Sequence, residues 1–271
     1  MKSFITTTKV LLCFCVIYYV VSAIVISAFL SNFVFQRFEI RATFQDRKDE
    51  FFSHDSSVID RIYGEQINEK CIIFFPGRQG GIYHYQDTLF PTFVQSGYTV
   101  HALSYPGYEG AKGSTSLAEI TDILANAIEQ VTSIHNCDDK HLVYIGRSLG
   151  ASIALAVAKE IPPTLIIIDS LGESLTSALQ HRLRQQWYLR PLEILPLQYL
   201  VNDIDSVDLI TKTYPVPIKV FQGTQDKQTP IDDLSAIQYL NHVELIPIAG
   251  ATHATTAEES LHLYQRYLSA L

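Results

Sequence analysis

The chain has 271 residues, 47% of which are hydrophobic, and a formal net charge of −8. This length and hydrophobic content fit one sizeable domain, with material left over for a further segment. An acidic chain without a basic tract excludes nucleic-acid binding, because contact with phosphate groups needs clustered Lys and Arg side chains.

A long apolar run lies near the N-terminus. No residue from Val10 to Gln36 is charged, and this run exceeds the about 20 residues that cross a bilayer core. We therefore expect residues 1–36 to form a retained single-pass membrane anchor. A cleaved signal peptide is the alternative, since Lys2 and Lys9 supply a basic start. Signal peptides, however, usually have an apolar stretch of only about 7–15 residues.

Basic residues flank the apolar run on both sides and leave its orientation open. The positive-inside rule counts the Lys and Arg residues close to a membrane span. These are Lys2 and Lys9 before the run, and Arg37, Arg41, Arg47 and Lys48 after it. With the α-amino group added, the two sides nearly balance. The side of the membrane on which the rest of the chain lies is therefore not determined.

Beyond the run, short apolar segments alternate with amphipathic or small-residue segments. Strands are expected at 70–75, 98–104, 141–145, 164–168, 217–221 and 243–248, with a less defined strand pair within 56–66. Helices are expected after a capping box at 116–119, at 149–160 and at 257–268. This alternation predicts an α/β domain over 37–271, with a mostly parallel central sheet and helices on both faces.

One segment breaks the alternation. Residues 171–214 are too many for an ordinary connection between a strand and the next element. They include Trp187 and the leucine-rich sequence PLEILPLQYL. We expect a short helical lid here, inserted after the strand at 164–168.

The sequence GRSLG, residues 146–150, has the form G-x-S-x-G and lies between a predicted strand and a slim helix rich in Ala and Gly. A sharp strand-to-helix turn holds a serine hydroxyl exposed at the end of a sheet, and it needs small residues on both sides. We therefore expect Ser148 to be a nucleophile rather than a simple helix cap. The N–H of Leu149, the first of the helix, is the expected oxyanion donor. Arg147 has no assigned role.

A serine nucleophile needs a base, and the base needs an acid that orients it. His253 lies in a small-residue loop directly after the last predicted strand, whereas His242 precedes that strand and His262 falls within the last helix. We expect His253 to be the base. The favoured acid is Asp226, in a loop after the strand at 217–221, and the alternative is Asp169, directly after the strand at 164–168.

The glycine-rich loop after the strand at 70–75 is the expected source of the second oxyanion donor. It reads PGRQGG, and glycines allow the backbone to approach a reacting group closely. The Arg78 N–H is the candidate. The Arg78 side chain is open to two interpretations, a group that holds an anion or a solvated surface residue.

The four cysteines do not indicate a disulfide scaffold or a zinc site. Cys13 and Cys15 lie in the apolar run, where they act as apolar packing residues or as acylation sites. Cys71 and Cys137 lie far apart, and neither a Cys-x-x-Cys pair nor a Cys/His ligand spacing occurs. We expect free thiols, with a single Cys71–Cys137 disulfide as the alternative, and no metal site.

Five segments together resemble the α/β-hydrolase superfamily, and more narrowly its membrane-anchored, short-lid serine hydrolases of the ABHD/Bem46 type. They are PGRQGG, YPGYEGAKGS, GRSLGAS, GTQDKQTP and GATH, spread over about residues 56–271. The resemblance implies the α/β-hydrolase fold and a triad of Ser148, Asp226 and His253. The superfamily usually has His-Gly where this chain has Pro76-Gly77, so a side-chain contribution from that position is lost.

These features predict hydrolysis of a carboxylic ester or thioester in a small-molecule or lipid-like acyl substrate, with no cofactor. The membrane would be a partner through the N-terminal helix. Two alternatives stay open. One is a membrane-tethered serine peptidase or aminopeptidase, because the same triad cleaves amides. The other is a non-catalytic, hydrolase-like interaction module.

Overall fold

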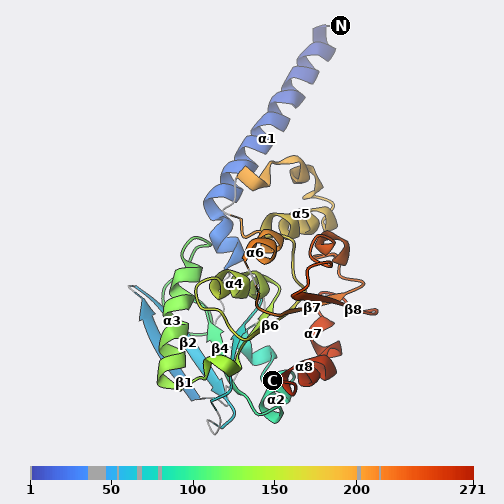
Figure 1. Cartoon of the computed structure of the whole chain (residues 1–271). Helices are drawn as coiled ribbons and strands as arrows, with labels where there is room; N and C mark the ends of the chain where they lie inside the picture. Colours follow the sequence, from blue (N-terminus) through green and yellow to red (C-terminus); the bar gives the residue numbers. More distant parts are fainter. Residues whose placement is uncertain are drawn as a thin grey trace.

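The computed structural model describes residues 2–35, 47–53, 55–65, 69–78, 81–199, 203–213 and 215–271. In these ranges the chain forms one eight-stranded sheet with the order β1-β2-β4-β3-β5-β6-β7-β8 (Figure 1). Its strands are β1 Arg47–Ser53, β2 Ser56–Tyr63, β3 Cys71–Phe75, β4 Thr99–Ser104, β5 Leu142–Arg147, β6 Leu165–Asp169, β7 Ile218–Gly223 and β8 Val243–Ile248. The β1–β2 and β2–β4 pairs are antiparallel and all others are parallel, which confirms the predicted mostly parallel sheet.

Helices cover both faces of this sheet, as predicted (Figure 1). One face carries α3 (Ile120–Ile134), α4 (Leu149–Ala158) and α6 (Ser206–Thr213), and the other carries α2 (Phe90–Gln95), α7 (Thr256–Glu259) and α8 (Leu261–Leu268). Short 3-10 helices are η1 Ile82–His84, η2 Asp139–His141 and η5 Ile231–Leu234. Every residue of β3 and β6 is buried, because strands covered on both faces have no solvent side.

The N-terminal edge of the sheet differs from the strand pair predicted within 56–66. Only β2 lies there, and its hairpin partner is β1, which begins at Arg47. The first four residues of β1 are charged, since an edge strand keeps one side in solvent, and they therefore lack a hydrophobic signal. Two predicted helices also differ from the structure. The helix after the capping box, α3, begins only at Ile120, and the Ser116 hydroxyl donates to the Glu119 carboxylate just before it. The closing helix is divided at Ser260 into α7 and α8.

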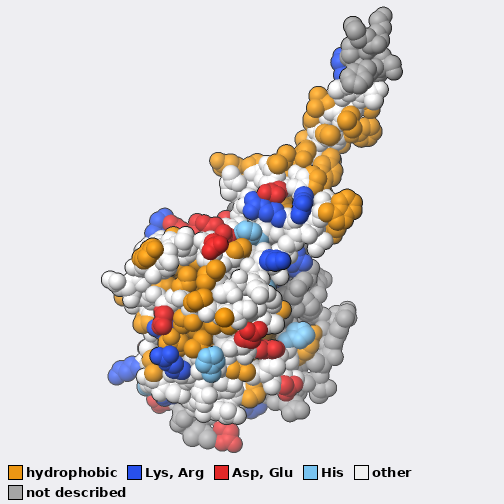
Figure 2. Space-filling model, turned by 90° about the vertical axis from the view of Figure 1, so that its right-hand side faces the viewer, with side chains coloured by type: hydrophobic (Ala, Val, Ile, Leu, Met, Phe, Trp, Pro, Cys, Tyr) orange, Lys and Arg blue, Asp and Glu red, His pale blue; other side chains and the backbone are white. Residues whose placement is uncertain are grey.

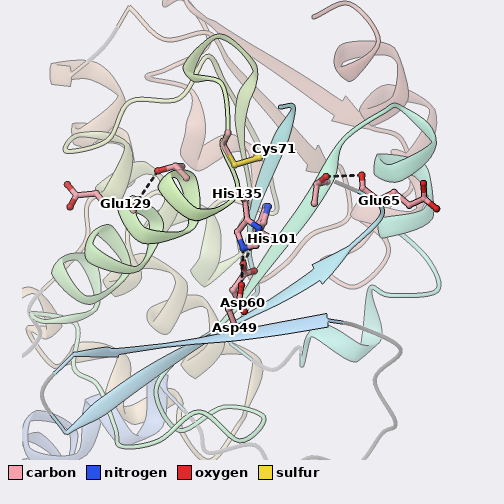
Figure 3. The surroundings of a disulfide bond; sticks show 10 residues. Asp49, Asp60, Glu65, Cys71, His101, Glu129 and His135 are labelled. Atoms are coloured by element: carbon pink, nitrogen blue, oxygen red, sulfur yellow. Dashed lines mark hydrogen bonds and ion pairs between the residues drawn. A yellow bond between two sulfur atoms is a disulfide. The ribbon is translucent and has the colours of Figure 1, made fainter. Parts of the chain in front are cut away.

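The expectation of free thiols at Cys71 and Cys137 is wrong. Their sulfur atoms are 2.02 Å apart and form a disulfide across 66 residues of sequence (Figure 3). Cys71 is the first residue of β3, and Cys137 follows the end of α3. The bond therefore ties the start of a central strand to the helix that covers it. Cys13 and Cys15 are free, and both are exposed.

The N-terminal segment forms the helix α1, Lys2–Val34, which extends away from the body of the molecule (Figure 1). Its stretch Thr7–Phe29 is long and apolar enough to cross a membrane, as the core helix of a soluble protein or a signal sequence would also be. The predicted boundary at 36/37 lies outside the described residues. Phe35, just before it, is buried in the core and packs edge-on against Tyr105.

The segment between β6 and β7 holds α5 (Leu175–Gln185), η3 (Arg190–Ile194), η4 (Leu197–Tyr199) and α6. It packs against the body-side half of α1 (Figure 1). A leucine cluster of the segment makes this contact with three residues of α1. The cluster consists of Leu183, Leu192, Leu195 and Leu197, and the residues of α1 are Tyr19, Ala23 and Ile26. The segment predicted as a lid thus lies beside the apolar helix.

The disulfide generates the first prediction. Cys137→Ser should lower the free energy of unfolding by about 2–4 kcal/mol, because it frees a long loop in the unfolded chain. Denaturant unfolding of the full chain in detergent measures this change. Cys13→Ser is the matched control and should leave the unfolding midpoint in place, since Cys13 is unpaired and exposed. An equal midpoint for Cys137→Ser would contradict the structural role of the bond.

Candidate active site

Ser148 lies in the sharp turn between β5 and α4, as the G-x-S-x-G pattern predicts. Its backbone has φ +51°, a conformation that L-residues rarely adopt, and its N–H donates to the Asp169 carbonyl at 2.9 Å. A Cβ on Gly146 would lie 2.6 Å from the Gly150 carbonyl oxygen, and a Cβ on Gly150 would overlap the Phe75 carbonyl. The two glycines therefore allow the turn to close directly on the end of β3.

The loop after β8 brings His253 to Ser148. His253 Nε2 lies 3.0 Å from Ser148 Oγ, from which it can accept the hydroxyl proton, and its Nδ1–H donates to Asp226 Oδ2 at 2.8 Å. The structure thus joins the three residues predicted as nucleophile, base and acid in one hydrogen-bonded series. His262, by contrast, is exposed on α8, and His242 precedes β8.

Asp226 is held by more than the histidine. Its Oδ1 accepts the backbone N–H groups of Gln228 at 2.8 Å and Thr229 at 2.9 Å, and its Oδ2 accepts the Thr229 hydroxyl at 2.7 Å. Burial raises the pKa of Asp226, but hydrogen bonds from His253 and Thr229 and the charge of His253 outweigh it. The pKa of this carboxyl is therefore below its usual value, and Asp226 stays ionised beside the imidazole.

Asp169, the alternative acid, is paired elsewhere. It is fully buried, and its carboxylate accepts Arg147 Nε at 3.2 Å and the Tyr264 hydroxyl at 3.0 Å. The structure therefore places Asp226, and not Asp169, on Nδ1 of His253.

Arg147 is the residue that sequence reasoning missed. Its Nη2 donates to the backbone carbonyls of His253 at 2.7 Å and Ala254 at 3.0 Å, and its Nη1 donates to the Tyr85 hydroxyl at 3.1 Å. Burial lowers the pKa of Arg147, but Asp169 and Tyr85 more than compensate and hold it above its usual value. This permanent cation fixes the histidine loop. No local signal marks it, because its partners lie in distant segments.

The glycine-rich loop after β3 lies next to Ser148. A Cβ on Gly77 would be 3.6 Å from the Ser148 Cβ. The Tyr105 hydroxyl donates to the Pro76 carbonyl at 2.9 Å and the Tyr108 hydroxyl to the Arg78 carbonyl at 3.3 Å, so two tyrosines fix the loop from behind. Residues 79–80 lie outside the described residues. Arg78 and Leu149, the two predicted oxyanion donors, line one cavity with Ser148.

Apolar and polar side chains both line this cavity. The apolar ones are Val34, Leu117, Leu149, Leu175, Ala178 and Leu179, and the polar ones include Arg78, Arg182, Gln228 and Thr229. Val34 belongs to α1, so the apolar helix contributes directly to the cavity. Burial and the charge of Arg182 lower the pKa of Arg78 to about 10, and both arginines line the cavity.

Comparison with known proteins locates a family match over this site. The model of the Alpha/beta hydrolase family matches residues 72–226, which is more than half of the chain. Two uncharacterized proteins of Mycobacterium tuberculosis are each 27% identical over 135 residues, which is 49% of this chain and 44% of theirs. The chain therefore matches less than half of the length of these relatives.

Several solved structures share the fold. An esterase of Pyrococcus furiosus has a TM-score of 0.67 at 15% identity, over 87% of this chain and 97% of its own. The thioesterase domain from the curacin biosynthetic pathway has a TM-score of 0.60 at 14% identity, over 83% and 99%. Est1E from Butyrivibrio proteoclasticus, solved with ferulic acid bound, has a TM-score of 0.61 at 14% identity, over 82% and 96%. These likenesses establish the fold.

The lowered pKa of Asp226 generates a prediction about pH and stability. A carboxyl with a depressed folded-state pKa stabilises the fold above its unfolded pKa of about 3.9, and this contribution is lost as pH falls through the folded pKa. The loss of unfolding free energy caused by Asp226→Asn should therefore be larger at about pH 6 than at about pH 3. Urea unfolding of both proteins measures it, and a difference independent of pH would contradict it.

Proposed function

Because the chain belongs to the alpha/beta hydrolase family, we propose that it is a serine hydrolase that cleaves carboxylic ester or thioester bonds of acylated, lipid-like substrates. One observation carries the proposal: Asp226, His253 and Ser148 form a continuous hydrogen-bonded series that ends in a cavity lined in part by apolar side chains. Esterases and a thioesterase among the proteins that share the fold are consistent with it.

The proposed reaction has two halves. As Ser148 Oγ attacks the acyl carbon, His253 Nε2 takes its proton and then gives it to the leaving alcohol or thiol. Backbone N–H groups of Leu149 and Arg78 stabilise the oxyanion. Water then attacks the acyl-enzyme, with His253 again as the base, and releases the acid. Asp226 orients the imidazole and supports its positive charge, for which its ionised state is required.

The mixed lining of the cavity supports a substrate with an apolar and an anionic part. Leucine side chains and Val34 offer an acyl chain an apolar surface beside Ser148. Arg78 and Arg182 bring two positively charged side chains to the same cavity. Guanidiniums hold carboxylate or phosphate groups in paired hydrogen bonds. We therefore propose an acyl substrate that carries an anionic group, such as the phosphate of a lipid headgroup.

The surroundings of the cavity support access from a membrane. Hydrophobic side chains continue from α1 onto the adjoining part of the body, with Lys and Arg side chains beside them (Figure 2). The segment beside α1 exposes Trp187, Tyr188, Ile194 and Tyr199. Exposed Trp and Tyr are typical of membrane interfaces. A single-pass anchor of the ABHD/Bem46 type would place the cavity entrance at the surface of the lipid.

Activity measurements on Ser148→Ala test the mechanism. It should lose about ten-thousandfold or more of kcat on an ester and a thioester and should no longer react with a fluorophosphonate probe. His253→Ala should lose a similar factor, whereas His262→Ala, with an exposed histidine, should keep its activity. Unchanged activity of Ser148→Ala would overturn the site. Cleavage of short peptides in preference to the ester and the thioester would favour the peptidase. Failure of the probe to label the wild type would favour a non-catalytic module.

A second prediction separates the two arginines of α5. Arg182 lines the cavity, whereas Arg184 is exposed and pairs with Glu193 at 2.6 Å. Arg182→Gln should lower kcat/KM about tenfold for an acyl ester with a phosphate group and leave a neutral ester of equal chain length unchanged. Arg184→Gln is the matched control and should affect neither substrate. An equal loss of kcat/KM on the phosphate-bearing and the neutral ester would contradict an anionic group in the substrate.

A further inference from the structure

Four side chains with metal-binding chemistry meet at the antiparallel edge of the sheet, near the disulfide (Figure 3). Asp49 comes from β1, Asp60 from β2 and His101 from β4, while His135 is the residue that caps the C-terminal end of α3. None of them belongs to the active-site cavity. Asp60 and His101 are fully buried, and Asp49 is partly exposed and offers a path from solvent.

Three of these groups lie close enough together for a shared ion, and Asp49 contacts one of them, His135. His101 Nδ1 lies 2.7 Å from Asp60 Oδ2, and His135 Nε2 lies 2.9 Å from Asp49 Oδ2. The two imidazole rings have centroids 4.7 Å apart, and one ligand atom each from Asp60, His101 and His135 lie within 4.8 Å of one another. Bonds of about 2.0–2.1 Å in a tetrahedral site separate neighbouring ligand atoms by about 3.4 Å. Small side-chain shifts would therefore suffice for these three residues, and the Asp49 carboxylate would turn from His135 toward the ion as the fourth ligand.

The charges at this place need a cation. Asp49 and Asp60 are directly opposite each other in the β1–β2 register, and like charges in such a pair destabilise a sheet. The C-terminal end of α3, where His135 lies, adds the negative end of a helix dipole. Two protonated imidazoles would supply positive charge but would repel each other at this ring separation. One divalent cation between two neutral imidazoles would neutralise both carboxylates without that repulsion.

Unsatisfied atoms also point to a ligand. Among the described residues, Asp60 Oδ1 and His101 Nε2 are buried and have no hydrogen-bond partner. A buried carboxylate oxygen without a partner is costly, and a metal ion would satisfy Asp60 Oδ1 directly. The Cys71 and Cys137 sulfurs also lie within 4.8 Å of a His101 ring nitrogen.

We propose that Asp49, Asp60, His101 and His135 bind one divalent transition-metal ion, with Zn²⁺ the best match. Two imidazole nitrogens and two carboxylate oxygens form a ligand set that suits Zn²⁺ in tetrahedral geometry. All four positions are protein ligands, which is typical of structural rather than catalytic zinc. The ion would join the β1–β2 hairpin to β4 and to the end of α3. This proposal does not rest on the proposed hydrolase activity.

The experiment uses the full chain without a histidine tag, purified in detergent with its disulfide intact. Zinc titration followed by metal analysis should give one ion per chain, and saturating Zn²⁺ should raise Tm by about 5 °C. Asp49→Asn and His135→Gln, both at the partly open end of the cluster, should weaken Zn²⁺ affinity at least about tenfold. They avoid the fully buried Asp60 and His101, whose replacement can prevent folding.

The chain offers a matched control pair. Asp138 and His141 form a similar carboxylate–imidazole contact at 2.9 Å at η2, and neither belongs to the group of candidate ligands. Asp138→Asn and His141→Gln should leave Zn²⁺ affinity unchanged. Absence of stoichiometric zinc, or equal losses in the control pair, would overturn the proposal.

The nearby cysteines define the remaining alternative. Cys71, Cys137 and His101 also group within 4.8 Å, so reduced thiols would form a different ligand set. Co²⁺ in the oxidised protein should show the weak visible bands of nitrogen and oxygen ligands without a thiolate charge-transfer band. Binding that requires a dithiol reductant and disappears in Cys71→Ser would assign the ion to the thiols and overturn the proposal.

Discussion

The first turn of α4 packs directly on the carboxyl ends of β3 and β5, where no space remains for a side chain at Gly146 or Gly150. This close contact forces Ser148 into its positive-φ conformation and leaves its hydroxyl at the end of the sheet. It also brings the glycine-rich loop that follows β3 alongside Ser148. The positions of Ser148, the helix N-terminus and the loop therefore share one steric cause, and the positions of the other groups follow from it.

Electrostatics then decides which carboxylate bonds His253. Asp169 ends β6 and Asp226 follows the neighbouring strand β7; both are buried, and a buried carboxylate needs a partner. Arg147 neutralises Asp169 and with the same guanidinium holds the backbone of the histidine loop. Asp226 therefore accepts from the His253 imidazole, and the Thr229 hydroxyl also donates to its carboxylate. One arginine thus separates a structural carboxylate from the one beside His253.

The sequence allows the order of strands and helices and the residues Ser148, Asp226 and His253 to be predicted, because each site residue follows a strongly apolar strand. Prediction from the sequence fails where the relevant contact is between distant segments. The charged strand β1 gains its partner only in the hairpin, and Cys71 meets Cys137 only through the packing of α3 on β3. Sequence-based prediction misses two further features for the same reason: the contacts of Arg147, and the cluster of Asp49, Asp60, His101 and His135. No sequence spacing relates residues that come from separate elements.

The contact between α1 and the segment after β6 bears on how the molecule is handled. A shortened version that starts after the apolar helix is the usual route to a soluble preparation of a single-pass protein. Here it would uncover the leucine cluster that Tyr19, Ala23 and Ile26 cover, and it would remove Val34 from the cavity wall. The helix is thus part of the domain's own packing. Purification of the full chain in detergent or lipid nanodiscs preserves that packing.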